Sequence, residues 1–256
     1  MNTNATTKIN KLMSIYPNGT VLLASWLREQ GYSLDLQKHY KKSHWLESIG
    51  TGAMKRYGSD VGYEGAVYAL QEQLGLSIHP GAKTALSMLG KAHYIELAQT
   101  KAIIFGVKGE ILPSWFKNYN WGITIEYYCT QFLPANLGMT NFEFQTYQIK
   151  ISGAVRAVME CLYLAPDKQD LLECYQIIEG MNNARPNLVQ ELLESCSSVK
   201  VKRLFLYMAE KANHEWFQHL NIKKIDLGKG KRSIVKNGTY IVKYKITVPK
   251  ELERYV

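Results

Sequence analysis

Residues 20–40, TVLLASWLREQGYSLDLQKHY, contain two helical patterns separated by a short turn. Thr20 can cap the first helix, and Gly31 suits its C-terminal end because glycine adopts a left-handed backbone conformation without strain. Ser33 can cap the second helix, since its hydroxyl oxygen can accept a bond from a free backbone N–H group. A glycine-containing turn of about three residues is typical of a helix-turn-helix. This stretch therefore predicts the centre of a helix-turn-helix domain.

The flanking segments extend the prediction to a winged helix. Residues 7–16 carry apolar side chains at helical spacing, and the Pro-Asn-Gly sequence that follows ends this helix. Two strand-like runs within residues 45–57 lie on either side of Gly50-Thr51-Gly52, which predicts a β-hairpin with a glycine-rich tip. We therefore predict an N-terminal winged helix-turn-helix DNA-binding domain over residues 1–60.

The rest of the chain, residues 61–256, predicts a larger mixed domain and hence an α+β fold class. Its helical patterns cover residues 63–74, 82–89 and 113–116 and most of 153–212, and its strand-like runs cover 93–97, 101–107, 123–130 and 142–151. Asn237-Gly238 is a strong turn signal, because both residues tolerate a positive φ. It predicts a C-terminal β-hairpin whose strand over residues 240–248 alternates an apolar face with a basic one.

The composition is that of a folded protein without a membrane segment. Apolar residues make up 46% of the chain and charged residues 21%, which is ordinary for a globular protein. No stretch approaches the ~18 apolar residues of a membrane helix, and the first residues lack the apolar run of a signal peptide, so we expect a cytoplasmic protein. The four cysteines form no Cys-x-x-Cys pair. We expect buried free thiols, no metal and no cofactor.

Positive charge is concentrated at the two ends of the chain. Residues 1–60 hold 8 Lys/Arg and 4 Asp/Glu, and residues 197–256 hold 14 and 5, whereas the segment between them has a net charge of −4. Clustered positive charge is the electrostatic signature of a protein that binds nucleic acid. A solvated, soluble surface is the alternative interpretation.

Within the third predicted helix, Leu36 and Tyr40 are expected to face the core, which would turn Gln37, Lys38 and Lys41 outward towards DNA. Lysine neutralises phosphate or donates to guanine, and glutamine can make two hydrogen bonds to adenine. The alternative is an ordinary solvated helix face. Further predicted contacts, mainly to phosphate, are those of Lys42, Lys55 and Arg56. The tryptophans, including Trp45, are expected mainly in the core.

A second basic group lies near the C-terminus and could form a second nucleic-acid surface or a surface for an acidic partner. It could equally be an edge hairpin that lysines keep soluble. Its candidate residues are Lys200, Lys202, Arg203, Lys229, Lys231, Arg232, Lys243 and Lys245.

Enzyme motifs are missing from the sequence. It has no His-Glu-x-x-His, no Gly-x-Ser-x-Gly and no acidic cluster of a two-metal nuclease. The segment 228–232, GKGKR, lacks the spacing of a phosphate-binding P-loop. We therefore expect a protein that is not an enzyme.

Several segments resemble the AbiEi antitoxin family of transcriptional regulators. In the N-terminal part these are residues 19–31 (GTVLLASWLREQG), 43–50 (SHWLESIG) and 52–56 (GAMKR); in the C-terminal part they are residues 199–211 (VKVKRLFLYMAEK), 225–232 (IDLGKGKR) and 243–249 (KYKITVP). The resemblance spans nearly the whole chain. His44 departs from it, since we expect a glycine before the Trp-Leu pair.

The resemblance implies a type IV toxin-antitoxin system that acts in abortive infection against phage. Its antitoxin represses its own operon by binding operator DNA through the winged helix, and its C-terminal domain counters a nucleotidyltransferase toxin without needing a stable complex. It places DNA contact on Gln37, Lys38 and Lys41, with Lys55 and Arg56 on the wing, and the antitoxin role on the final basic segment. The alternative is an interaction module that docks an acidic partner or a toxin directly, with DNA binding secondary.

Overall fold

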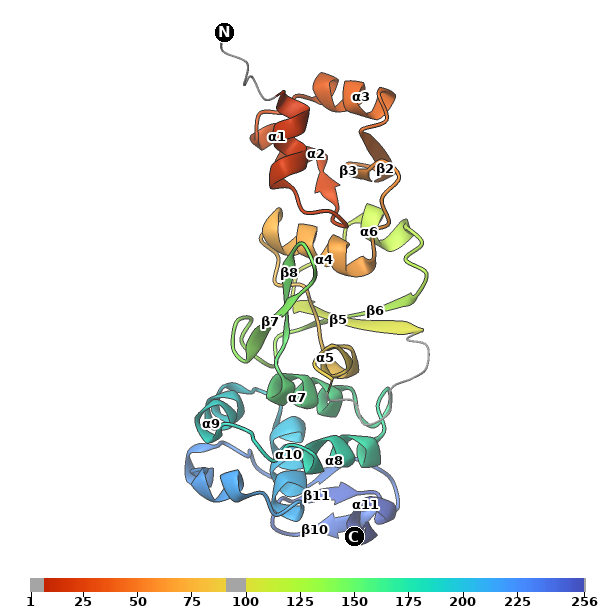
Figure 1. Cartoon of the computed structure of the whole chain (residues 1–256). Helices are drawn as coiled ribbons and strands as arrows, with labels where there is room; N and C mark the ends of the chain where they lie inside the picture. The colour runs from red at the N-terminus through yellow and green to blue at the C-terminus, as the bar shows by residue number, and fades with distance from the viewer. Residues whose placement is uncertain (1–6, 91–99, 256) are drawn as a thin grey trace. The chain divides into compact units, whose positions relative to one another are not determined.

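The computed structural model describes residues 7–90 and 100–255, so the predicted strand over residues 93–97 lies outside the described residues. The described chain mixes helices and strands, which confirms the α+β fold class (Figure 1). It divides into two compact units. The first comprises residues 1–79, 109–124 and 141–150, and the second comprises residues 80–108, 125–140 and 151–256.

The first unit begins with the predicted winged helix-turn-helix. Helices α1 (Lys8–Ile15), α2 (Ala24–Glu29) and α3 (Leu34–Lys42) are followed by the wing, which consists of β2 (Leu46–Gly50) and β3 (Ala53–Arg56). Together with β1 (Leu22–Leu23), the wing forms an antiparallel sheet in the order β1-β3-β2. The side chains that these elements bury together are Leu12, Tyr16, Leu22, Leu27, Tyr32, Tyr40, Leu46 and Met54.

Side-chain caps set where α1 and α3 begin, whereas the pairing of β1 with β3 sets where α2 begins. The hydroxyls of Thr7 and Ser33 accept backbone N–H groups at the starts of α1 and α3, as predicted for Ser33. Thr20 does not cap α2, because its hydroxyl donates to the carbonyl of Pro17. The next residues pair with β3 as β1, so α2 begins only at Ala24, and the predicted cap at Thr20 is wrong.

Two further helices of the first unit support the wing. The side chain of Gln73, which ends α4 (Tyr63–Glu72), accepts from the backbone N–H of Leu23 at 2.8 Å and donates to the carbonyl of Val21 at 2.6 Å. Helix α6 (Ser114–Asn118) packs against β2. A Cβ atom on Gly50 would lie only 2.8 Å from the Cβ of Trp115, so this close approach requires glycine.

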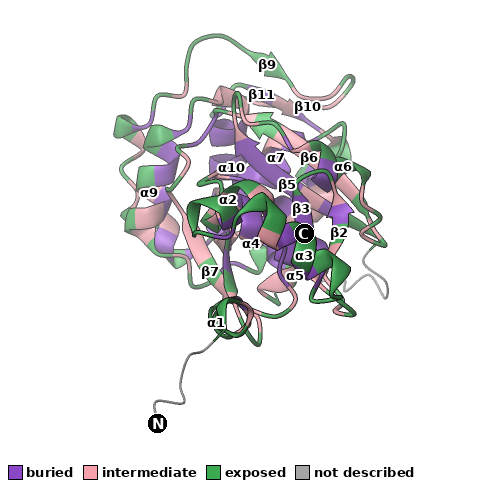
Figure 2. Cartoon of the chain, turned by 90° about the horizontal axis from the view of Figure 1, so that it is seen from above, coloured by how far each residue is buried: buried purple, intermediate pink, exposed green. Residues whose placement is uncertain are grey.

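Helices form the larger part of the regular structure in the second unit. Its helices are α5 (Ala82–Met88), α7 (Ala154–Leu164), α8 (Leu171–Glu179), α9 (Pro186–Ser195) and α10 (Val199–Lys211). Figure 2 shows that α7 and α10 are mostly buried, and they pack on each other and, in the case of α7, on α5. The predicted helical region over residues 153–212 is thus confirmed.

Strands β4 (His79–Pro80), β5 (Lys101–Val107) and β6 (Thr124–Thr130) form one sheet in that order. The predicted single strand over residues 142–151 is wrong, because the chain turns there. The backbone N–H of Phe144 donates to the carbonyl of Tyr147 at 2.7 Å. This turn joins β7 (Met139–Glu143) to β8 (Gln148–Ser152), and the two strands pair.

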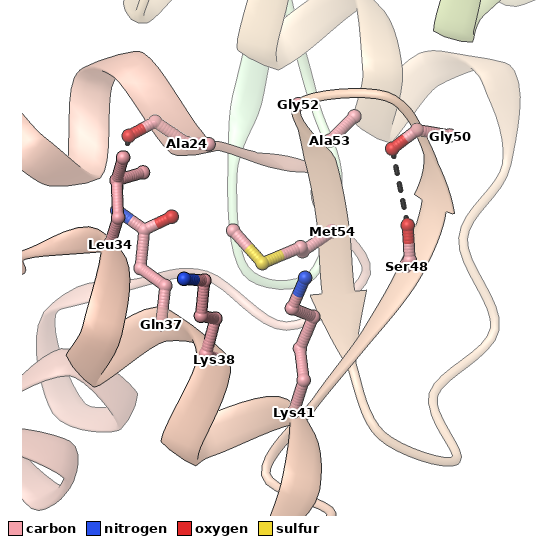
Figure 3. A pocket seen from close by; sticks show the side chains of 10 residues that line it. All are labelled: Ala24, Leu34, Gln37, Lys38, Lys41, Ser48, Gly50, Gly52, Ala53 and Met54. Atoms are coloured by element: carbon pink, nitrogen blue, oxygen red, sulfur yellow. Dashed lines mark hydrogen bonds between the residues drawn. The ribbon is translucent and has the colours of Figure 1, made fainter.

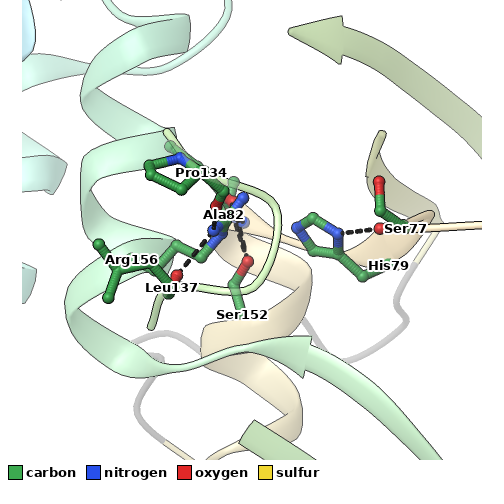
Figure 4. Close-up of polar contacts among 8 residues, drawn as sticks. Ser77, His79, Ala82, Pro134, Leu137, Ser152 and Arg156 are labelled. Carbon is green, nitrogen blue, oxygen red and sulfur yellow. Dashed lines mark hydrogen bonds and ion pairs between the residues drawn. The ribbon is translucent and has the colours of Figure 1, made fainter. Parts of the chain in front are cut away.

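A fully buried carboxylate, that of Glu160 on α7, ties the second unit together. It accepts from the hydroxyl of Ser152 at 2.7 Å, from the Nε of Arg156 at 2.9 Å and from the backbone N–H of Ala82, the first residue of α5, at 2.9 Å. The same guanidinium donates to the carbonyls of Pro134 and Leu137 (Figure 4). One ion pair therefore joins β8, α5 and a loop to α7.

The C-terminal sheet differs from the predicted hairpin. Its strands β9 (Arg232–Ser233), β10 (Thr239–Ile241) and β11 (Ile246–Val248) follow the order β10-β11-β9. The predicted single strand over residues 240–248 is wrong, since the N–H of Lys245 donates to the carbonyl of Val242 and closes a turn between β10 and β11. Val242 is consequently 74% exposed instead of lying on the apolar face.

The remaining short elements of this unit are η1 (Glu215–His219), η2 (Ile222–Lys224) and α11 (Lys250–Arg254). Cys161, Cys174 and Cys196 are buried free thiols as predicted, whereas Cys129 is exposed, contrary to the prediction. Over residues 7–90 and 100–255, no helix has the length and apolar character that crossing a membrane requires.

We expect substitution of Glu160 by alanine to lower the free energy of unfolding by about 3–5 kcal/mol, because it leaves the guanidinium of Arg156 buried without its carboxylate. Urea denaturation followed by circular dichroism measures this loss. Glu191→Ala on α9 is the matched control, since this carboxylate is exposed, and its effect should stay within about 0.5 kcal/mol. Equal losses in the two variants would contradict the role assigned to Glu160.

Candidate nucleic-acid interface

Helix α3 occupies the position of the recognition helix in the helix-turn-helix. The turn before it is closed by the backbone N–H of Tyr32, which donates to the carbonyl of Leu27, and Gly31 has the predicted positive φ of 85°. Tyr40 is buried and Leu36 packs on the core, as predicted. The face of α3 that remains exposed carries Leu34, Asp35, Lys38, His39, Lys41 and Lys42.

Gln37 does not belong to this exposed face, so the prediction that it turns outward is wrong. Its side chain is 3% exposed because it lies on the same side of the helix as Tyr40, three residues further along. Its Nε2 donates to the carbonyl of Ala24 at 3.1 Å and to the carbonyl of Tyr32 at 2.8 Å. Gln37 therefore holds α3 against the start of α2 and the intervening turn.

The lysines of α3 are exposed and weakly paired. The Nζ of Lys38 lies 3.4 Å from Asp35, in a pair whose side chains are 74% and 93% exposed, and such pairs contribute little. Lys41 and Lys42 have no acidic group within 4 Å among the described residues. Their positive charge is available to a partner.

A hollow of about 150 Å³ lies between α3 and the wing. Figure 3 shows the side chains of Lys38 and Lys41 rising from successive turns of α3 towards this hollow. The backbone N–H of Ala24 donates to the carbonyl of Gly52 at 2.8 Å, which holds the wing tip beside the start of α2. The hollow is lined by Ala24, Leu34, Gln37, Lys38, Lys41, Ser48, Gly50, Gly52, Ala53 and Met54.

Lys55 and Arg56 hold the base of the wing instead of projecting from it, contrary to the prediction. The Nζ of Lys55 lies 2.9 Å from a carboxylate oxygen of Glu47. The guanidinium of Arg56 donates to the carbonyls of Met13 and Tyr16, and its burial lowers its pKa. Both cations therefore make their contacts within the domain, between the strands of the wing or between the wing and the end of α1.

An exposed aromatic group at the base of the wing was not predicted. Trp45 is 46% exposed and Tyr57 54% exposed, and the rings of His44 and Tyr57 lie 4.7 Å apart. His44 has a φ of 56°, in the left-handed region that favours glycine. The expectation of a glycine at this position was the one sequence signal for this backbone geometry.

The C-terminal basic group divides into buried and exposed members. Arg203 is 1% exposed and donates to four carbonyls, those of Leu227, Gly228, Gly230 and Lys245. Lys202 is also buried, and the Nζ of Lys200 donates to two carbonyls at the end of α7. The prediction of a binding surface is therefore wrong for the buried Lys202 and Arg203, while Lys200 is half-buried and bonded within the unit.

The exposed members of the group are Lys229, Lys231, Arg232, Lys243 and Lys245. They lie on the loop and the turn that Arg203 holds, because its carbonyl partners belong to both segments. Lys231 lies over the ring of Tyr240 at 5.1 Å, and Lys243 pairs with Glu210. Among residues 7–90 and 100–255, no group of three His, Cys, Asp or Glu side chains is placed to hold a metal ion.

We expect Gln37→Ala to lower the free energy of unfolding by about 1–2 kcal/mol, because the carbonyls of Ala24 and Tyr32 lose their buried donor. If Gln37 is structural, operator and scrambled DNA should lose affinity by the same factor. Denaturant unfolding and fluorescence anisotropy measure the two effects. The base-reading role would be restored if the variant is as stable as wild type and binds scrambled DNA as well as wild type does, but binds the operator less well.

Two family models match this chain. Residues 5–97 match the model described as "Transcriptional regulator, AbiEi antitoxin N-terminal domain", and residues 99–249 match "Transcriptional regulator, AbiEi antitoxin, Type IV TA system". No curated protein matches. The chain is similar to the crystal structure of the RV2827C protein from Mycobacterium tuberculosis, with 10% identity, a TM-score of 0.60, and coverage of 93% of this chain and 88% of that one. At this identity the likeness shows a shared fold alone.

Both descriptions name a transcriptional regulator and an antitoxin, and neither names an enzyme. The matched segments include all of the winged helix and the C-terminal sheet. The chain belongs to the AbiEi family of transcriptional regulators, the antitoxins of type IV toxin-antitoxin systems.

Proposed function

We propose that the protein represses its own operon by binding operator DNA through the winged helix, and that its C-terminal part counters a nucleotidyltransferase toxin. The observation that carries the first half is the exposed row of Lys38, Lys41 and Lys42 on α3, beside a wing. Phosphates attract such a row, and a helix in this position enters the major groove in winged-helix proteins.

The rigidity of the winged helix supports the same proposal. Hydrogen bonds hold α3 to α2 through Gln37 and hold the wing to α2 through Gly52. A binding surface whose parts are held in place before binding loses less conformational entropy when the partner arrives. The exposed lysines are thus presented on a preorganised support.

A gel-shift assay with the DNA upstream of the protein's own gene tests the first half. We expect Lys38→Ala/Lys41→Ala to weaken binding at least tenfold, because two cations on the DNA-facing side of α3 are removed. Lys8→Ala/Lys11→Ala on α1 is the control, since it removes the same charge from exposed positions of another helix. Equal binding by wild type and by both variants would contradict the proposed site, and no binding by wild type would contradict the proposed function.

The exposed cations of the C-terminal sheet support the second half. Arg203 fixes the loop and the turn that carry them. Lys243 pairs with Glu210, which leaves the exposed charges of Lys229, Lys231, Arg232 and Lys245 for a partner. An anionic partner fits such a surface, either an acidic face of a protein or a nucleic acid.

Growth rescue tests the second half, with the adjacent gene expressed as the toxin. We expect Lys229→Glu/Lys231→Glu to abolish rescue while operator binding stays within twofold of wild type, because the reversed charges repel the anionic partner. Lys108→Glu/Lys117→Glu, at two other exposed positions, should rescue normally. Co-purification of a stoichiometric complex would favour direct docking of the toxin, and rescue by the Lys229/Lys231 variant would contradict the assignment of this surface.

A further inference from the structure

We propose that the hollow between α3 and the wing seats one phosphodiester group of the DNA backbone, held jointly by Lys38 and Lys41. This inference rests on the proposed DNA binding and assigns a specific role to these two lysines. With α3 in the major groove and the wing beside it, the backbone of one DNA strand would cross the space between them.

The charges around the hollow match a single anion. Lys38 and Lys41 are three residues apart, so they are neighbours on one side of the helix, and both side chains are directed towards the same space (Figure 3). The ammonium of lysine is a compact charge that binds phosphate from many directions. Asp35 competes only for Lys38, and does so at 3.4 Å in an exposed pair.

The hollow has the size to hold a single chemical group and is small for a complete ligand. Pockets that enclose a drug-sized molecule usually measure about 300–1,000 Å³, whereas this one measures about 150 Å³. Its walls include the apolar side chains of Leu34 and Met54, which suit the carbon atoms of a deoxyribose. A Cβ atom on Gly52 would meet nothing within 4 Å, so the wing tip leaves space for the DNA strand to continue past the hollow.

The side chains of α3 that line the hollow are poorly suited to reading bases. A bidentate contact with adenine needs both the amide nitrogen and the amide oxygen of a glutamine, and the nitrogen of Gln37 already donates to two carbonyls. The two lysines are directed towards the wing. They therefore supply affinity and register that do not depend on the base sequence.

Salt dependence gives a quantitative test, because each phosphate of duplex DNA that a protein neutralises adds about 0.9 to the slope of log affinity against log salt. If the two lysines share one phosphate, Lys38→Ala/Lys41→Ala should reduce the slope by about 0.9, whereas two separate phosphates would give about 1.8. Operator and scrambled duplexes should bind more weakly by the same factor. Fluorescence anisotropy at several salt concentrations measures both quantities, with Lys8→Ala/Lys11→Ala as the control.

A second measurement locates the phosphate. Uncharged methylphosphonates placed one at a time along the operator should weaken wild-type binding at one linkage in each bound site, and the Lys38/Lys41 variant should be insensitive to that linkage. A slope change near 1.8, or weaker binding of the operator alone, would overturn the shared phosphate site. Absence of DNA binding by wild type would instead overturn the proposed function.

A test with inorganic phosphate distinguishes a phosphate group of DNA from a free phosphate ion as the anion that the hollow binds. If the hollow is built for DNA, adding millimolar phosphate should not raise the melting temperature of wild type by more than it raises that of the Lys38/Lys41 variant. A rise confined to wild type, in a protein whose DNA affinity does not depend on these lysines, would assign the hollow to a free anion and overturn the inference.

Discussion

The pairing of β1 with β3 is the constraint on which the candidate interface depends. Leu22 lies opposite Met54 and Leu23 opposite Ala53, and both leucines are almost completely buried. This pairing joins the segment just before α2 to the inner strand of the wing. The helix-turn-helix and the wing are therefore joined through a shared sheet, which sets the space between α3 and the wing.

The remaining hydrogen bonds around β1 reinforce the same arrangement. The side chain of Gln73 bonds to the backbone of Val21 and Leu23 and so continues the hydrogen bonding of the strand beyond its partner β3. Unpaired backbone groups are costly when buried, and a glutamine satisfies one donor and one acceptor at once. A two-residue strand persists here because neighbouring segments complete its bonds.

Cations in this protein perform two different tasks, and their positions in the sequence do not tell them apart. Arg203 and Arg56 are surrounded by backbone carbonyls and stabilise loops. The arginine guanidinium suits this task because it offers five donors in a fixed plane. Lys38 and Lys229 remain exposed. The net charge therefore overstates the charge that is available to a partner.

The sequence alone determined the class of fold and the position of many of its elements, because these depend on local patterns. Helical spacing predicted the correct position of α1, and Ser33 caps α3 as predicted. The first and last residues of β5 were also predicted correctly. The resemblance of the end segments to the AbiEi family was also sufficient to predict the family.

Only the tertiary structure decided which predicted site residues are exposed. Gln37, Lys55, Arg56 and Arg203 have the chemistry of DNA contacts, yet each is drawn inward by carbonyls or a carboxylate from another segment. Helix periodicity places a side chain on a face but does not show how wide the buried face is. That width depends on the neighbouring elements, so the division between structural and available cations became visible only in the folded chain.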